Sequence, residues 1–464
     1  MEITFRLNGE TVTETVEDPT ATLLDWLRET RGLTGTKEGC NEGDCGACSV
    51  IVTDGRGARA LNACILFLPQ LHGRAVRTVE GVAAPDGTLH PVQAALVERH
   101  GSQCGFCTPG FVTTMACAHL NGRIDHADQV AGNLCRCTGY APILQAARDC
   151  EAAPVPDHMR DAVGLSMDDR EGGEDVPPVG DPSLPRSSDE LAAWYAANPD
   201  GTLIAGATDV GLWVTKQFRD LGAVAFLLGC DDLRGVEDTG DAFEVGAATD
   251  IETLREAVAD RIPALAEMLR RYGSVQVRNA ATIGGNIANG SPIGDSPPPL
   301  IALGSTLHLR RGDERRSLPL EEFFLDYGKQ GRRPGEFVER VTIPLDRADA
   351  LHVHKLSKRF DQDISAVCAA FLLPVEDGLL CGVRAALGGM AGIPKRAAAV
   401  EAALEGRPFT EATLRAAGEA FADDFQPLSD MRATADYRLT ACRGMLLRCL
   451  HERSGARTLL DLTA

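Results

Sequence analysis

The residues best suited to chemistry are cysteines, which crowd into the first third of the chain. The chain has 15 cysteines. Four stand at Cys40, Cys45, Cys48 and Cys64. A C-x4-C-x2-C run with a distant fourth cysteine is typical of a plant-type [2Fe–2S] cluster, whereas zinc sites more often show two CxxC knuckles. A loop that wraps two irons closely needs left-handed backbone and open approach, which Gly39, Gly43 and Gly46 can supply.

A second set consists of two short pairs. Its members are Cys104, Cys107, Cys135 and Cys137. Thr108-Pro109 and Thr138-Gly139 predict a helix after each pair, and free N–H groups at a helix N-terminus favour anionic thiolates. On spacing alone this set fits zinc or iron. A neighbouring cluster favours iron, because two clusters in series form an electron wire.

The remaining cysteines and the histidines show no ligand pattern. The other cysteines are Cys117, Cys150, Cys230, Cys368, Cys381, Cys442 and Cys449. We interpret them as small buried hydrophobic residues. His352 and His354 alternate along an expected strand, and we expect both on its surface.

Local patterns predict an α+β multidomain chain. We expect strands over 3–7, 11–16, 49–53, 202–204 and 223–228, and helices over 22–29, 91–98, 109–120 and 141–149. The predicted domains are 1–80 with a ferredoxin-like β-rich fold, 81–150 with a helical bundle, 184–345 and 346–464. An acidic stretch rich in Pro and Gly marks a linker over 151–183.

Composition limits the classes of partner. The formal charge of −20 over 464 residues argues against nucleic acid and against an anionic membrane surface. We find no apolar run near the ~20 residues that span a bilayer. The N-terminus, Met1 to Phe5, lacks the layout of a signal peptide, so we expect a cytoplasmic protein.

The cysteine motifs resemble those of one enzyme family. The segments 39–48, 103–110 and 132–140 are similar to the iron–sulfur signatures of the xanthine dehydrogenase family of molybdenum hydroxylases, and all eight ligand positions match. The resemblance implies a β-grasp ferredoxin-like domain and a helical [2Fe–2S] domain. It also implies that the cluster of the helical domain lies nearer the molybdenum and the other cluster nearer the flavin.

The second half of the chain offers two glycine turns but no GxGxxG fingerprint. Residues 203–210 read as a strand, a glycine turn and a helix start, which can present N–H groups to phosphate. Residues 280–287 form a second turn around a Gly pair. Either turn alone is weak. Together, behind the cysteine domains, they resemble the FAD-binding domain of the same family, of the vanillyl-alcohol-oxidase type, followed by its C-terminal α+β flavoprotein domain.

The resemblance assigns FAD contacts residue by residue. They are Leu203, Ile204, Ala205, Gly206, Ala207, Thr208, Asp209, Val210, Tyr272, Thr282, Gly285, Asn286, Asp295, Val338 and Lys355, with Arg359 and Gln362 nearby. Two positions depart from the family pattern. Ala207 replaces the usual Gly or Asn, which indicates either a right-handed backbone or local strain. Gly328, after Tyr327, replaces a frequent Arg on the nicotinamide side of the flavin.

The resemblance also implies a function and a partner. The layout is similar to the small subunit of bacterial two-subunit members, in which a molybdopterin-binding large subunit supplies electrons. They pass through two [2Fe–2S] clusters to FAD and then to NAD+, in a heterotetramer of two small and two large subunits. No side chain is expected to act as a general acid or base, so we name no catalytic residue. The alternatives are the same module of an aldehyde, nicotinate or carbon monoxide dehydrogenase, and a zinc-binding interaction protein without enzymatic activity.

Overall fold

A computed structural model describes residues 1–161 and 181–456, which divide into two compact units. Unit 1 comprises 1–194, 200–231 and 273–281, and unit 2 comprises 195–199, 232–272 and 282–464. The predicted FAD-binding region, 184–345, thus contributes to both units, and its boundaries stay a prediction. Most of the predicted linker lies outside the described residues. Its start is held in unit 1 by a buried ion pair between Arg77 and Asp161, 2.5 Å apart.

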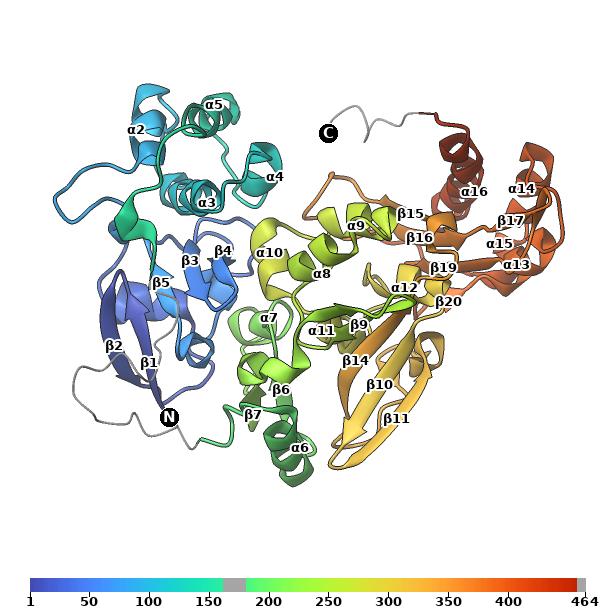
Figure 1. Cartoon of the computed structure of the whole chain (residues 1–464), viewed down its shortest axis with the longest axis horizontal. Helices are drawn as coiled ribbons and strands as arrows, with labels where there is room; N and C mark the ends of the chain where they lie inside the picture. Colours follow the sequence, from blue (N-terminus) through green and yellow to red (C-terminus); the bar gives the residue numbers. More distant parts are fainter. Residues whose placement is uncertain (162–180, 457–464) are drawn as a thin grey trace. The chain divides into compact units, whose positions relative to one another are not determined.

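A five-stranded mixed sheet begins unit 1, in the order β2-β1-β5-β3-β4 (Figure 1). Its strands are β1 (Glu2–Leu7), β2 (Glu10–Thr15), β3 (Ser49–Asp54), β4 (Gly57–Asn62) and β5 (Ala75–Arg77). Only β1 and β5 pair in parallel. Ile3 and Phe5 alternate inward and pack on Leu24, which lies in the short helix α1 (Leu23–Asp25). This helix continues as a π-helical turn over Trp26–Thr30, so the predicted helix is present with one wider turn.

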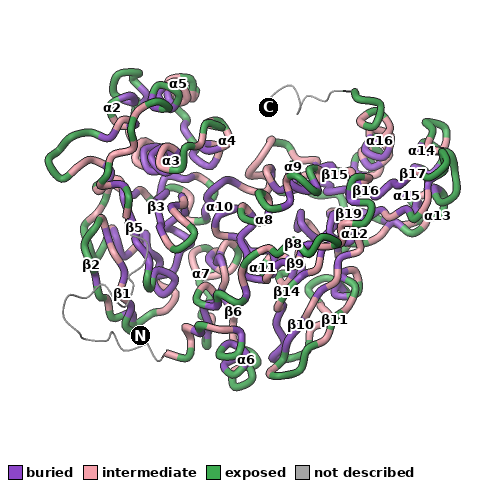
Figure 2. Tube along the Cα trace, in the orientation of Figure 1, coloured by how far each residue is buried: buried purple, intermediate pink, exposed green. Residues whose placement is uncertain are grey.

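Four helices follow the sheet: the three that were predicted and the short helix α4, which was not. They are α2 (Pro91–Glu98), α3 (Thr108–Leu120), α4 (His126–Val130) and α5 (Ala141–Asp149). Pro91 occupies the first helical position of α2, where its missing N–H costs nothing. Helix α3 is buried almost all round and packs against β3 and β4 (Figure 2). This packing joins the helical part to the sheet.

Shorter elements complete unit 1. They are β6 (Thr202–Ile204), α7 (Val210–Thr215), β7 (Val224–Phe226) and α10 (Val275–Ala280), with α6 (Ser188–Ala197) crossing the unit boundary. Strands β6 and β7 were both predicted from their apolar runs, and they pair in parallel. Helix α10 packs on β4.

Unit 2 contains two larger antiparallel sheets and the remaining helices. The first has the order β11-β10-β14-β9-β8 and the second β15-β16-β19-β20. The strands are β8 (Val236–Asp238), β9 (Ala242–Gly246), β10 (Thr306–Arg311), β11 (Glu314–Pro319), β12 (Phe324–Asp326), β13 (Lys329–Gln330), β14 (Phe337–Pro344), β15 (Leu351–Leu356), β16 (Val367–Leu372), β17 (Val375–Glu376), β18 (Leu379–Leu380), β19 (Arg384–Gly388) and β20 (Lys395–Arg396). The helices are α8 (Ile251–Val258), α9 (Pro263–Arg270), α11 (Ile283–Asn289), α12 (Pro297–Leu303), α13 (Ala398–Leu404), α14 (Glu411–Gly418), α15 (Phe421–Asp424) and α16 (Ala435–Arg453).

Two local predictions for unit 2 are wrong. Gly284 and Gly285 do not form a turn but lie in the first turn of α11, where Thr282 Oγ1 accepts a hydrogen bond from Gly285 N. His354 does not lie on the surface of β15, because its ring is buried against Phe371. Burial lowers the pKa of His354 to about 4. A favourable cap in the first case and tertiary packing in the second outweighed the local pattern.

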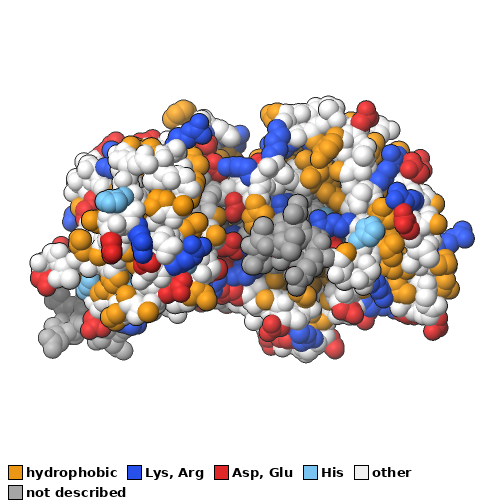
Figure 3. Space-filling model, turned by 90° about the horizontal axis from the view of Figure 1, so that it is seen from above, with side chains coloured by type: hydrophobic (Ala, Val, Ile, Leu, Met, Phe, Trp, Pro, Cys, Tyr) orange, Lys and Arg blue, Asp and Glu red, His pale blue; other side chains and the backbone are white. Residues whose placement is uncertain are grey.

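Within the described residues, no helix is both long enough and apolar enough to span a lipid bilayer. Acidic and basic side chains are interspersed on the face shown in Figure 3.

Candidate functional site

The first cysteine set converges in space, although Cys64 is 16 residues from Cys48 along the chain. The thiols contact one another in the order Cys45, Cys40, Cys64 and Cys48. The loop also aims N–H groups at sulfur: Gly43 N lies 3.2 Å from Cys64 Sγ, and Cys45 N lies 3.3 Å from Cys40 Sγ. Such donors spread the charge of a thiolate cluster.

Close packing explains the loop glycines Gly39 and Gly43. A Cβ on Gly39 would lie 2.7 Å from Cys45 Sγ, and one on Gly43 would lie 2.7 Å from Ile65. Gly43 also has a φ of +80°, which L-residues rarely adopt. The residues present therefore fit a [2Fe–2S] group, since the loop leaves no room for side chains on its inner face.

Crowding of the sulfur atoms shifts the pKa of each thiol. Hydrogen bonds from Cys45 and Cys64 hold the pKa of Cys40 well below its usual range. The same contact with Cys40, together with burial, raises the pKa of Cys45. The thiols thus titrate as a group rather than singly.

The second set sits where two helices begin, as predicted. Cys107 caps α3, and Tyr140, with a φ of +68°, precedes α5. The closest thiol contacts pair Cys107 with Cys135 and Cys104 with Cys137. Burial and the contact with Cys135 raise the pKa of Cys107 to about 12.

The second set is more exposed than the first. Cys104 and Cys137 are exposed, whereas Cys48 and Cys64 are buried. No group of three or more His, Cys, Asp or Glu residues in 1–161 or 181–456 is arranged to hold a single metal ion.

A hydrogen bond joins the two cysteine loops. Leu134 N, beside Cys135, donates to Cys45 O over 2.9 Å. A Cβ on Gly39 would lie 3.7 Å from the ring of Phe106, which places that ring between the two loops. The two candidate ligand sets are therefore neighbours inside unit 1.

The predicted phosphate loop, 203–210, also belongs to unit 1 and runs from the last two residues of β6 to the first residue of α7. A Cβ on Gly206 would lie 1.7 Å from Ala280 O, so only glycine fits there. Ala207 has a φ of +57° and is buried, which decides between the two possibilities for this residue in favour of strain. The loop leads into α7, and Asp209, its N-cap residue, is exposed.

Helix α7 connects this loop to the first cysteine set. Thr215 Oγ1 donates to Asn41 O over 2.8 Å, and Lys216 Nζ donates to Cys40 O. A Cβ on Gly211 would lie 3.0 Å from Ile65, the residue after Cys64. The phosphate loop and the Cys40 loop are thus held together by one short helix.

The other predicted FAD contacts lie in unit 2 and form two polar groups and one apolar position. In the first group, Asn286 Nδ2 donates to the Tyr272 hydroxyl over 3.0 Å, and Ser296 Oγ donates to Asn286 Oδ1 over 2.5 Å. In the second, Lys355 Nζ lies 2.7 Å from Asp295 Oδ2, and both side chains are buried. Val338 is buried in β14.

Three supporting residues escaped prediction. Ser365 Oγ donates to Asp295 Oδ1 over 2.5 Å, and Arg271 O accepts from Lys355 Nζ over 3.0 Å. Ser296 follows Asp295 directly, and Ser365 ends the segment that begins at Lys355, so sequence proximity was a usable signal for both serines. Arg271 directly precedes the predicted contact Tyr272, so the same signal applied to it.

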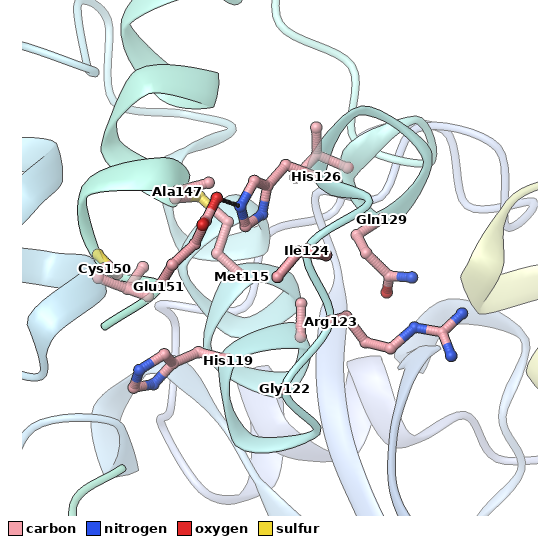
Figure 4. Close-up of a pocket in the computed structure, with 13 residues that line it drawn as sticks. Met115, His119, Gly122, Arg123, Ile124, His126, Gln129, Ala147, Cys150 and Glu151 are labelled. Carbon is pink, nitrogen blue, oxygen red and sulfur yellow. Dashed lines mark hydrogen bonds and ion pairs between the residues drawn. The ribbon is translucent and has the colours of Figure 1, made fainter. Parts of the chain in front are cut away.

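A small cavity lies at the C-terminal end of α3. It has a volume of about 50 Å³, and His126 and Glu151 point toward each other there, 2.8 Å apart (Figure 4). Such a volume holds on the order of one to a few waters. We place no cofactor in it.

Comparison with known proteins gives a consistent assignment. Four family profiles match: a 2Fe-2S iron-sulfur cluster binding domain at 5–68, a [2Fe-2S] binding domain at 78–148, the FAD binding domain in molybdopterin dehydrogenase at 182–346, and the CO dehydrogenase flavoprotein C-terminal domain at 352–453. The chain is an iron–sulfur and FAD module of the molybdenum hydroxylase family. It has the composition of the family's electron-transfer module, and its fold is α+β multidomain, as predicted.

Individual relatives agree at this level. Xanthine dehydrogenase of Emericella nidulans is 31% identical over 97% of this chain, and xanthine dehydrogenase/oxidase of Gallus gallus is 31% identical over 89%. The module spans 38% and 37% of those relatives. A solved carbon monoxide dehydrogenase from Hydrogenophaga pseudoflava is 28% identical, with a TM-score of 0.55 over 59% of this chain and 97% of that chain.

Proposed function

We propose that this chain is the iron–sulfur and FAD subunit of a xanthine dehydrogenase. It would pass electrons from a molybdenum centre on a partner subunit through two [2Fe–2S] clusters to FAD and then to NAD+. When bound, the clusters supply one-electron transfer and FAD supplies the change to two-electron transfer. The observation that carries the proposal is the continuity of unit 1, where Leu134 N donates to Cys45 O and Thr215 Oγ1 donates to Asn41 O. Together these contacts link both cysteine sets and the phosphate loop.

The cysteines are assigned as cluster ligands in two groups of four. Cys104 and Cys137 are exposed, so their set is the one that an external electron donor can approach. Cys48 and Cys64 are buried, so their set depends on internal neighbours. This difference in exposure supports the order of helical cluster first and ferredoxin-like cluster second.

We assign FAD binding to the predicted contact residues, some of which belong to unit 1 and others to unit 2. In unit 1 the loop 203–210 offers backbone N–H groups at a position where Gly206 allows close approach of the backbone. In unit 2 the Asp295–Lys355 pair and the Tyr272–Asn286 pair are held rigidly by hydrogen bonds. Rigid polar groups of this kind orient a cofactor.

The proposals for the substrate and the partner of this chain rest only on its similarity to relatives. Several relatives of similar identity are named xanthine dehydrogenase, which favours xanthine as the substrate. We propose a molybdopterin-binding large subunit, a heterotetramer of two small and two large subunits, NAD+ as the acceptor, and a cytoplasmic location.

A second candidate is the same module in another molybdenum hydroxylase. Nicotinate hydroxylase of Emericella nidulans is 30% identical over 96% of this chain. The similarity to carbon monoxide dehydrogenase structures fits this alternative equally well.

The test is purification of the chain with its co-expressed large subunit, followed by substrate-dependent reduction of NAD+. We expect turnover of xanthine, loss of turnover in Cys107→Ser, and retention in Cys117→Ser, which alters a buried thiol of the same helix outside the ligand set. Turnover of nicotinate or an aldehyde without xanthine would favour the second candidate. A colourless protein that contains zinc would contradict both.

A further inference from the structure

Gln276 in α10 is a buried side chain that contacts the surroundings of both cysteine sets. It is 1% exposed. Its Nε2 lies 3.0 Å from Asn133 Oδ1, 3.1 Å from Thr114 Oγ1 and 3.2 Å from Ser49 Oγ. One amide group thus faces three acceptors from three different segments of unit 1.

Two of these acceptors are close in sequence to candidate ligands, and the third lies in a helix that begins directly after one. Ser49 follows Cys48, and Asn133 precedes Cys135 by two positions. Thr114 lies in α3, which is capped by Cys107. A single side chain therefore touches the supports of both sets.

The acceptors are tied to each other as well. Asn133 Nδ2 donates to Gly46 O over 2.9 Å, and Ser49 Oγ donates to the same carbonyl over 2.7 Å. Gly46 stands between Cys45 and Cys48, so the network reaches the inside of the first loop. The hydrogen bonds of such a buried network rigidify the segments that they join, although Gln276 Oε1 has no hydrogen-bond partner among the described residues.

Two glycines, one from each cysteine loop, allow the loops and the Gln276 side chain to approach closely. A Cβ on Gly132 would lie 2.0 Å from Gln276 Oε1, and a Cβ on Gly46 would lie 2.2 Å from Gly132 O. The two cysteine loops thus interlock around the end of the Gln276 side chain. No ordinary side chain fits at either glycine without moving a neighbour.

We propose that Gln276 is a positioning residue that fixes the distance and orientation between the two iron–sulfur clusters. Its amide holds the Asn133 segment against Ser49 and Gly46, which keeps the Leu134–Cys45 hydrogen bond between the loops in place. This role rests on the proposed assignment of the cysteines as ligands of two [2Fe–2S] clusters. It goes beyond that assignment, because Gln276 touches no ligand sulfur and no substrate.

The test compares Gln276→Met with Asn279→Leu in the full chain. Methionine keeps the length of the side chain but has no N–H donor. Asn279 lies on the same helix and donates to Ala60 O over 3.1 Å, so Asn279→Leu weakens the docking of α10 on β4 without touching the cysteine loops. Both variants are reduced with dithionite and examined by electron paramagnetic resonance (EPR), with iron and FAD content measured in parallel.

The proposal predicts that Gln276→Met keeps both clusters but changes the magnetic interaction between them, and that it slows FAD reduction by an added electron donor roughly tenfold. Asn279→Leu is expected to keep the interaction of the unaltered chain. Equal effects of the two variants would show that only helix docking matters and would overturn the proposal. An unchanged interaction in Gln276→Met would also overturn it.

Two further outcomes, a variant that does not fold and a failure of the proposed function, can be distinguished from a failure of this proposal. If Gln276→Met does not fold, Ser49→Ala removes the hydroxyl that accepts from Gln276 and Asn133 and donates to Gly46 O, and the same change in the interaction is expected at smaller size. An unaltered interaction in Ser49→Ala would then count against the proposal. If the unaltered chain shows no pair of cluster signals, the proposed function itself fails, independently of Gln276.

Discussion

The contact between the two cysteine loops can be tested by adding a single methyl group at Gly46. A Cβ at this position would lie 2.2 Å from Gly132 O and 2.9 Å from Asn133 Cα. Both are backbone atoms, so relief requires that one loop moves. Gly139 is a matched control, because its φ of +69° is close to the +67° of Gly46 and no atom lies within 4 Å of its Cβ position.

Two free-energy costs, backbone strain and overpacking, determine the expected loss of stability. A left-handed L-residue costs roughly 1–2 kcal/mol, and this term is shared by Gly46→Ala and Gly139→Ala. The unfolded chain loses the same conformational freedom in both variants, so that effect cancels in the comparison. Overpacking of a filled site costs about 1–3 kcal/mol more, and only Gly46→Ala incurs it. We therefore expect Gly46→Ala to be less stable than Gly139→Ala by about 1–3 kcal/mol.

The assay is a denaturant titration of both variants. Unfolding is monitored through the release of iron to a chelator that becomes coloured when it binds iron. The midpoint for Gly46→Ala should fall below that for Gly139→Ala. Equal midpoints would refute the reasoning, since the loops would then not be in contact at Gly46.

Two further predictions concern unit 2. Lys355→Met leaves Asp295 buried without its cation and should destabilise the folded chain by roughly 3–5 kcal/mol, measured by denaturant titration, whereas Lys358→Met, at an exposed lysine, should change stability by less than about 1 kcal/mol. Burial lowers the pKa of His354 from 6.5 to about 4, so the unfolded chain binds a proton at higher pH than the folded chain. The contribution of neutral His354 to the free energy of unfolding is therefore fully present above pH 6.5. It declines by up to roughly 3 kcal/mol as the pH falls toward 4. In His354→Asn the decline between these pH values should be smaller, and an identical pH profile of the melting temperature would contradict the burial of a neutral ring.

The parts of the fold that local chemistry determines could be predicted from sequence. Proline at the first position of α2 and the Thr108-Pro109 start of α3 marked helix ends correctly, because capping depends on neighbours along the chain. The spacing of Cys40, Cys45 and Cys48 likewise predicted a glycine-rich loop of converging thiols.

Contacts between distant segments could not be predicted. Gln276 meets Ser49 although 227 residues separate them, and nothing in the short helix around Gln276 points to that contact. His354 follows the alternation of β15, yet helix α16 brings Cys449 within 3.5 Å of its Nε2 and covers it. Ala207 could not be placed in the left-handed region from its type, because alanine rarely adopts that conformation.

The central claim is that two separate [2Fe–2S] clusters lie on the two cysteine sets. The most direct measurement is EPR of the dithionite-reduced chain beside Cys48→Ser and Cys137→Ser. Two distinct signals are expected in the unaltered chain, with a different one lost in each variant and FAD retained in both. A single signal, or the loss of the same signal in both variants, would contradict the account.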